Sequence, residues 1–187
     1  MKPGLIADIE RASNHDGDGL RTVVFFKGCP LCCAWCHNPE CINTEVQTLF
    51  YPEKCIHCGK CAQGCYSGAR VVCGKQYTPN ELLAEISQDK AYYGSSGGVT
   101  FSGGEPMLQF PFIRETAALL QGIGIYIDTC GNCGEAAFAE MLELADGVLF
   151  DLKHMDTARH KQLTGAGNDR ILQNFELAAA SRVQLTV

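Results

Sequence analysis

Cysteine thiols are the side chains of this sequence whose type and spacing indicate chemistry. Ten of the twelve cysteines lie between Cys29 and Cys73. Within this stretch, Cys29, Cys33 and Cys36 follow the spacing CxxxCxxC. Three thiolates on a short loop can hold three irons of a [4Fe-4S] cluster and leave the fourth iron open to an outside ligand. The alternative is a zinc site, because Cys33 and Cys36 alone have a spacing that suits tetrahedral zinc.

A second group of cysteines has the spacing CxxCxxCxxxC, which is typical of bacterial ferredoxins. Its members are Cys55, Cys58, Cys61 and Cys65. Because only one complete run of this kind is present, we predict one auxiliary [4Fe-4S] cluster here. Cys65 is the first choice for its fourth ligand, and Cys73 and Cys41 are the alternatives.

The composition of the 187-residue chain limits the class of protein. Hydrophobic residues make up 46% and charged residues 19%, which is typical of a globular domain. A formal net charge of -6 gives no electrostatic reason to expect binding to nucleic acid. No apolar run approaches the ~18 residues of a membrane span, and no apolar signal segment follows the start. We therefore expect a cytoplasmic protein, in which clustered cysteines indicate metal or redox chemistry rather than disulfides.

Strands and helices that could position these cysteines alternate along the chain. The expected strands cover residues 22–26, 98–101, 124–127, 147–150 and 183–187, and the expected helices cover residues 81–90, 110–121, 135–144 and 169–180. This alternation predicts an α/β fold with a parallel sheet and right-handed crossovers. Polar and glycine-rich residues follow the strands, at the edge where such sheets place their chemistry. The last expected strand ends the chain without a polar tail, which we interpret as a C-terminal truncation.

Four segments at these strand ends together resemble one enzyme family. They are residues 26–40 around the first cysteine loop, the SGGEP sequence at 102–106, Asp128 with Thr129, and the DLK sequence at 151–153. In this order they are similar to the radical S-adenosylmethionine (SAM) activating enzymes of glycyl radical enzymes, the pyruvate formate-lyase activase group. The resemblance extends over nearly the whole chain. It departs at Asp18, where the family usually has proline, and at Cys32, where a basic residue is common.

The resemblance implies a fold and a division of the chain. The fold is a partial (β/α)6 radical SAM barrel, of which this chain supplies about five strands, with a small ferredoxin-like Cys-rich insert. Residues 1–40 would contain N-terminal strands and the cluster loop, residues 41–77 the insert, and residues 78–187 the remainder of the barrel. A SAM-contacting histidine near the family's sixth strand is absent from this chain.

The resemblance also implies cofactors and the residues that hold them. Cys29, Cys33 and Cys36 would carry the catalytic cluster, with SAM on its open iron. The residues expected to contact SAM are Trp35, Cys36, His37, Gly104, Asp151, Leu152 and Lys153. Asp128, Thr129, Asp151 and the carbonyl of Leu149 resemble a monovalent-cation site. For Cys130 and Cys133, which follow another strand, packing is our first interpretation and a further metal the alternative.

The activity implied by the resemblance is that of an activase. Such an enzyme cleaves SAM reductively, and the resulting radical takes a hydrogen from one glycine of a partner glycyl radical enzyme. Flavodoxin or ferredoxin would donate the electron, and the auxiliary cluster would relay it or serve in docking. One alternative is a radical SAM enzyme that acts on a small molecule or another peptide. A second alternative is a non-catalytic iron–sulfur electron carrier.

Overall fold

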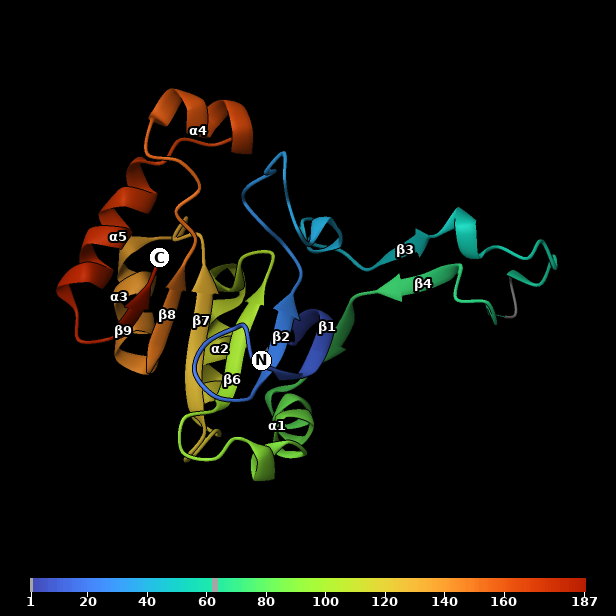
Figure 1. Ribbon diagram of the computed structural model, residues 1–187, viewed down its shortest axis with the longest axis horizontal. Coiled ribbons are helices and arrows are strands. Elements are labelled where there is room, and N and C mark those ends of the chain that lie inside the picture. Colours follow the sequence, from blue (N-terminus) through green and yellow to red (C-terminus); the bar gives the residue numbers. More distant parts are fainter. Residues whose placement is uncertain (1, 62–63) are drawn as a thin grey trace.

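The computed structural model describes residues 2–61 and 64–187, and its centre is a seven-stranded sheet (Figure 1). In chain order its strands are β1 (Gly4–Ser13), β2 (Arg21–Phe26), β5 (Lys75–Tyr77), β6 (Gly98–Gly103), β7 (Gly124–Thr129), β8 (Gly147–Phe150) and β9 (Gln184–Thr186). Their spatial order is β5-β1-β2-β6-β7-β8-β9. Strands β2, β6, β7, β8 and β9 pair in parallel, whereas β1 is antiparallel to both β2 and β5. The prediction of an α/β fold with about five barrel strands is confirmed.

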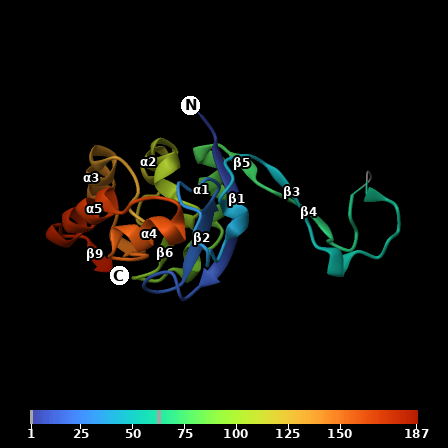
Figure 2. The same ribbon diagram turned by 90° about the horizontal axis from the view of Figure 1, so that it is seen from above.

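In the described residues, five α-helices connect the strands. They are α1 (Pro79–Ser87), α2 (Phe110–Ala117), α3 (Glu135–Leu144), α4 (Thr157–Thr164) and α5 (Asp169–Ala180). Helices α1, α2, α3 and α5 form one layer against the sheet, in which each helix contacts the next (Figure 2). Helix α4 stands apart from this layer, beyond the C-terminal ends of the parallel strands (Figure 1). None of the described helices is long and apolar enough to cross a membrane.

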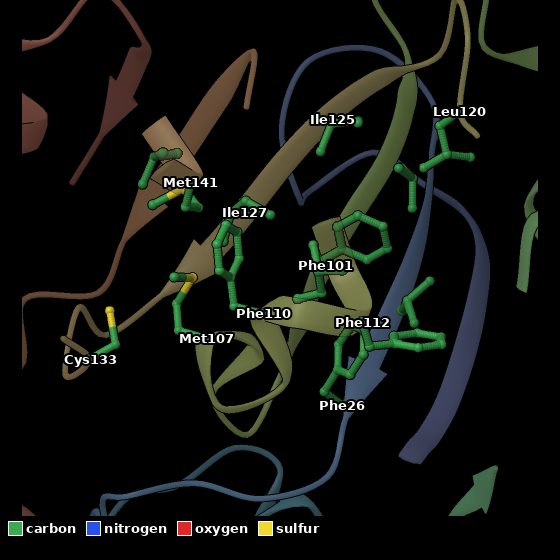
Figure 3. Packing of buried hydrophobic residues seen from close by; sticks show 14 of the residues in the cluster. Phe26, Phe101, Met107, Phe110, Phe112, Leu120, Ile125, Ile127, Cys133 and Met141 are labelled. Atoms are coloured by element: carbon green, nitrogen blue, oxygen red, sulfur yellow. The ribbon is translucent and has the colours of Figure 1, made fainter. Parts of the chain in front are cut away.

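The two faces of the sheet differ because side chains alternate along a strand. Val24 and Phe26 of β2 point into the hydrophobic core beneath the helices, while Phe25 between them lines a cavity on the other face. In β7, Ile127 packs in the same core and the next residue, Asp128, lines the cavity. Figure 3 shows how aromatic and branched side chains of the strands and of α2 fill this core. The face away from the helices is therefore free to carry polar residues.

Most expected elements are present, with some differences at their ends. Helix α3, strand β8 and helix α5 have the predicted bounds. The predicted helices 81–90 and 110–121 were too long, since α1 ends at Ser87 and α2 at Ala117. After α2 the chain must turn back toward β7, and it does so in short turns that end near Gly122, which has a positive φ of 71°. Helix α4 was not predicted at all.

After the cysteine loop, the chain between β2 and β5 forms an arm that extends away from the sheet (Figures 1 and 2). Its stem is a two-stranded antiparallel ribbon of β3 (Gln47–Phe50) and β4 (Arg70–Cys73). The second cysteine group lies in the loop beyond this ribbon, at the far end of the arm. Residues 62 and 63 of the expected insert lie outside the described residues.

Candidate active site

A cavity of about 590 Å3 lies where the parallel strands β2, β6, β7 and β8 end. Among the residues predicted for the site, those that line it are Cys29, Cys33, Trp35, Cys36, His37, Gly104, Asp128, Thr129, Asp151 and Lys153. The side chain of Leu152 does not line the cavity, because it is half-buried and packs against the hydrophobic core. Segments more than 100 residues apart in the sequence thus meet at one hollow.

Some residues of the cavity wall were missed by the sequence analysis. Strand β1 contributes Glu10 and Ser13, and the loop after it contributes His15 and Asp16. These side chains reach the cavity because β1 pairs antiparallel with β2 and carries its loop back beside it. The alternation of polar and apolar residues in this segment was the available signal, but it does not give the pairing partner or the register.

The cysteine loop after β2 presents three of its four thiols to the cavity. Cys29, Cys33 and Cys36 are half-buried, whereas Cys32 is exposed and does not line the cavity. The backbone N–H of Cys29 donates to the carbonyl of Ile42 at 3.0 Å, which anchors the start of the loop. The N–H of Cys36 donates to the carbonyl of Cys33 at 3.1 Å and closes a turn at its end. The backbone thereby separates the three thiols of the motif from the fourth.

The surroundings of the thiols determine how readily they ionise. Burial raises the pKa of Cys29 to about 11, and the charges of Glu105, Cys33 and Cys36 add to this effect. Burial also raises the pKa of Cys33, but the nearby ammonium of Lys153 opposes the shift. Since only thiolates ligate iron, metal binding here must displace protons. Lys153 is the side chain that favours the thiolate at Cys33.

The turn after β6 packs closely against the start of the cysteine loop. Gly103 has a φ of +108°, and the N–H of Gly104 donates to the carbonyl of Phe26 at 2.9 Å. A Cβ atom on Gly104 would lie 2.3 Å from the carbonyl oxygen of Gly28, which no side chain tolerates. Glycine at 104 is therefore required by the contact between two backbones. Its main chain still lines the cavity, where a SAM contact was predicted.

Glu105 belongs to the same segment but has a different environment. It is fully buried, and its carboxylate accepts hydrogen bonds from Thr129 Oγ1 at 2.7 Å, Cys130 N at 2.9 Å and Met107 N at 3.1 Å. Burial raises the pKa of Glu105, and these hydrogen bonds oppose the shift. Glu105 thus ties the turn after β6 to the end of β7. The sequence showed a glutamate after two glycines, but not that its carboxylate points inward.

Two carboxylates meet at the ends of β7 and β8. Asp128 accepts a hydrogen bond from Ser102 Oγ at 2.6 Å, and Asp151 forms an ion pair with Lys153. Burial raises the pKa of Asp128 to about 7, against the Ser102 hydrogen bond, and the charge of Asp151 adds to the rise. For Lys153, burial disfavours the charged form, but Asp151 outweighs it and raises the pKa. The hydroxyl of Thr129 donates to Glu105 and accepts from the N–H of Gly131.

Cys130 and Cys133 are buried after β7. Burial raises the pKa of Cys133 to about 12 and the pKa of Cys130 well above its usual value. The sulfur of Cys133 accepts a hydrogen bond from Asn174 Nδ2 at 3.8 Å, and Cys130 lines the cavity. Both environments favour protonated thiols, which agrees with the packing interpretation.

The second cysteine group surrounds a separate hollow of about 260 Å3 at the end of the arm. Cys55, Cys58, Cys61 and Cys65 all line it. Cys41 and Cys73 do not, because both are buried at the base of the arm beside Lys27. The ammonium of Lys27 donates to Glu40 O at 2.6 Å and lies 3.8 Å from the sulfur of Cys73. The two alternative ligands therefore belong to a different part of the arm from the four-cysteine run.

Both hollows offer the donor set of an iron–sulfur cluster, with three thiols of the cysteine loop in the first, beside Cys130, and four thiols in the second. Among residues 2–61 and 64–187, no three Cys, His, Asp or Glu side chains stand close enough to share a single metal ion. A cubane cluster gives each thiolate an iron of its own, so its ligands stand farther apart than those of one ion. All twelve cysteines are free thiols.

Comparisons with known proteins agree with this arrangement. A family model described as the Radical SAM superfamily matches residues 23–187. The chain is 39% identical over 186 residues to the pyruvate formate-lyase 2-activating enzyme of Escherichia coli K12, covering 96% of this chain and 64% of that protein. It is 36% identical over 215 aligned residues to the 4-hydroxyphenylacetate decarboxylase activating enzyme of Clostridioides difficile CD196, covering 95% and 68%.

One solved structure extends the comparison to the fold. QueE from Escherichia coli aligns with a TM-score of 0.54 at 15% identity, over 98% of this chain and 81% of that one. At this identity the likeness concerns the fold alone. The chain spans less than two thirds of the length of the E. coli activating enzyme that it matches.

Proposed function

Because the chain belongs to the radical SAM superfamily, whose members bind SAM at a [4Fe-4S] cluster, we propose that it is the activase of a glycyl radical enzyme. The observation that carries this proposal is the cavity in which Cys29, Cys33 and Cys36 face the polar ends of β6, β7 and β8. The two relatives described above are named for activating pyruvate formate-lyase 2 and 4-hydroxyphenylacetate decarboxylase, which supports a protein as the substrate.

The side chains of the cavity have separate tasks in this proposal. Cys29, Cys33 and Cys36 would hold three irons of the cluster and leave the fourth without a ligand from this loop. Lys153 and Asp151, which form an ion pair at the end of β8, offer opposite charges to the carboxylate and amino groups of SAM. When bound there, the cluster would supply the electron for reductive cleavage of SAM, the chemistry that an activase uses to take a hydrogen from its partner's glycine. Trp35 and His37 lie on the same loop as the cysteines and complete the SAM contacts.

The proposal includes a monovalent cation beside SAM. Burial raises the pKa of Asp128, and the negative charge of Asp151 at this corner of the cavity adds to the rise. A cation between the two carboxylates would favour the charged form of both. Leu149, whose carbonyl is the further candidate ligand, is the register partner of Asp128 between β7 and β8. The oxygen of Thr129 is the remaining candidate.

The arm would carry one auxiliary [4Fe-4S] cluster on Cys55, Cys58, Cys61 and Cys65. Cys65 is preferred as the fourth ligand because it shares the hollow with the other three, whereas Cys41 and Cys73 do not. The division into residues 1–40, 41–77 and 78–187 is part of the same proposal. The proposal also includes a cytoplasmic location and a flavodoxin or ferredoxin as electron donor. The free thiols and the expected redox chemistry support both.

The experiment that tests this function uses electron paramagnetic resonance (EPR) on the partner. The reconstituted, reduced chain is incubated anaerobically with SAM and a glycyl radical enzyme encoded beside it. We expect methionine release together with a glycyl radical signal on the partner, and neither with the Cys33→Ala variant. Methionine release without a radical on any partner would contradict the activase and favour a small-molecule substrate. A cluster that does not respond to SAM would favour the electron carrier.

A further inference from the structure

We propose that α4 and the turn after it are a clamp that holds the middle of the cysteine loop, with His160 and Thr164 as its positioning residues. The backbone N–H of Cys32 donates to the carbonyl of Thr164 at 2.8 Å, and that of Ala34 donates to the carbonyl of Leu163 at 2.9 Å. These contacts fall between the cluster cysteines, where the loop has no regular structure. The clamp thus acts on the segment that sets the spacing of the thiols.

The carbonyls of Leu163 and Thr164 are available because α4 ends there. The last carbonyls of a helix lack partners within the helix, and Gly165 stops α4 with a left-handed φ of 85°. The cysteine loop supplies the missing donors. The C-terminal end of a helix also carries partial negative charge, which disfavours nearby thiolates. The contribution of α4 must therefore be geometric, since its dipole opposes the charge of the cluster ligands.

A polar network fixes the end of α4 in place. His160 and Thr164 are fully buried, and they are the only buried side chains of α4. His160 Nδ1 lies 2.7 Å from the carbonyl of Ala166, which can only accept, so Nδ1 carries the proton. Thr164 Oγ1 donates to the carbonyl of His160 at 2.8 Å. Hydrophobic burial does not explain a helix that buries only a histidine and a threonine, so these hydrogen bonds determine its position.

A second set of hydrogen bonds holds the start of α4 and the segment that leads into it. The amide of Asn168, also fully buried, donates to the carbonyls of His154 at 2.9 Å and Met155 at 2.8 Å. Thr157 Oγ1 donates to the side-chain oxygen of Asn168 at 2.7 Å. The start of α4 is thereby tied to the residue that precedes α5. Lys153, one residue before this network, lines the cavity beside Cys33. Helix α4 thus contacts the cysteine loop at its C-terminal end, and the segment that leads into α4 starts next to the ion pair at the end of β8.

The clamp is tested by amide hydrogen exchange, measured residue by residue in the full chain without metal. Thr164→Val removes the buried hydroxyl at nearly constant volume, and Thr164→Ser retains it as the matched control. We expect exchange at Cys32 and Ala34 to accelerate roughly tenfold in Thr164→Val, as for the loss of one hydrogen bond. Exchange at Cys29, which Ile42 holds, should not change. Thr164→Ser should behave as the unaltered chain. Unchanged exchange at Cys32 and Ala34, or equal acceleration at Cys29, would overturn the clamp.

A second measurement connects the clamp with the cluster. After reconstitution, Thr164→Val should lose iron to a chelator several-fold faster than Thr164→Ser. An equal rate of iron loss would overturn the claim that the clamp positions the thiolates. If Thr164→Val does not fold, the pair His160→Leu and His160→Asn replaces it, because asparagine can still donate to Ala166. The proposal rests on the cluster proposed for this loop, but exchange in the metal-free chain needs neither cluster nor SAM. Its failure is therefore distinguishable from failure of the proposed function.

Discussion

Cys32 and Cys33 are adjacent in the sequence, yet their thiols have opposite surroundings. Cys33 is half-buried and lines the cavity, whereas Cys32 is exposed and faces away from it. The spacing CxxxCxxC selects Cys33, and the cavity contains the thiol of Cys33 but not that of Cys32. We expect cluster binding to require the thiol of Cys33 and to tolerate loss of the thiol of Cys32.

The prediction compares Cys33→Ala with Cys32→Ala after anaerobic reconstitution. Cys33→Ala should lose roughly four irons per chain, because a [4Fe-4S] cluster left with two thiolate ligands is not retained. Cys32→Ala should keep its full iron and sulfide content, since its backbone N–H and the three cavity thiols remain. The readout is iron and sulfide analysis of both variants. Equal iron content in the two variants would contradict the ligand set.

Glu105 gives a prediction about stability. Its buried carboxylate accepts three hydrogen bonds, and Glu105→Gln places an amide NH2 against at least one of those donors. We expect the free energy of unfolding to fall by about 1–3 kcal/mol, the usual cost of an unsatisfied buried polar group. The exposed Glu143→Gln is the matched control and should change it by less than about 0.5 kcal/mol. Urea denaturation followed by circular dichroism measures the free energy of unfolding of both variants. Equal losses in the two variants would contradict a stabilising role for the buried carboxylate of Glu105.

At the scale of elements, apolar periodicity determined what could be predicted. Helices α3 and α5 and strand β8 bury apolar side chains against the core, and their bounds followed from that pattern. Helix α4 buries only a histidine and a threonine, so it has no apolar pattern to recognise. The antiparallel pairing of β1 with β2 and β5 could not be predicted from the sequence either, because pairing is decided by contacts between distant segments.

The function of the arm can be tested separately from that of the sheet and its cavity. Its cysteine loop lies at the end farthest from the sheet (Figures 1 and 2). The double variant Cys55→Ala/Cys58→Ala should lose roughly four irons while the cluster of the first loop keeps its response to SAM. If the arm relays electrons, reduction of that cluster by flavodoxin or ferredoxin should also become slower. Stopped-flow reduction kinetics measure this rate, and an unchanged rate would leave docking as the role of the arm.

At the scale of the whole molecule, the sequence predicted which segments meet but not how they touch. The C-terminal ends of parallel strands share one edge of a sheet, so residues after β2, β6, β7 and β8 were expected to converge. The cavity contains them, with the exception of the Leu152 side chain. The contacts that hold them together could not be predicted, because the inward carboxylate of Glu105 and the carbonyls at the end of α4 depend on three-dimensional packing.

In the proposed function, SAM binds at a cluster carried by the loop after β2. The most direct measurement is EPR of the anaerobically reconstituted, reduced chain with and without SAM. We expect a [4Fe-4S] signal whose g values shift when SAM is added, and which disappears in Cys33→Ala but persists in Cys55→Ala/Cys58→Ala. A signal that is indifferent to SAM, or a SAM-dependent shift that survives in Cys33→Ala, would contradict the proposed function.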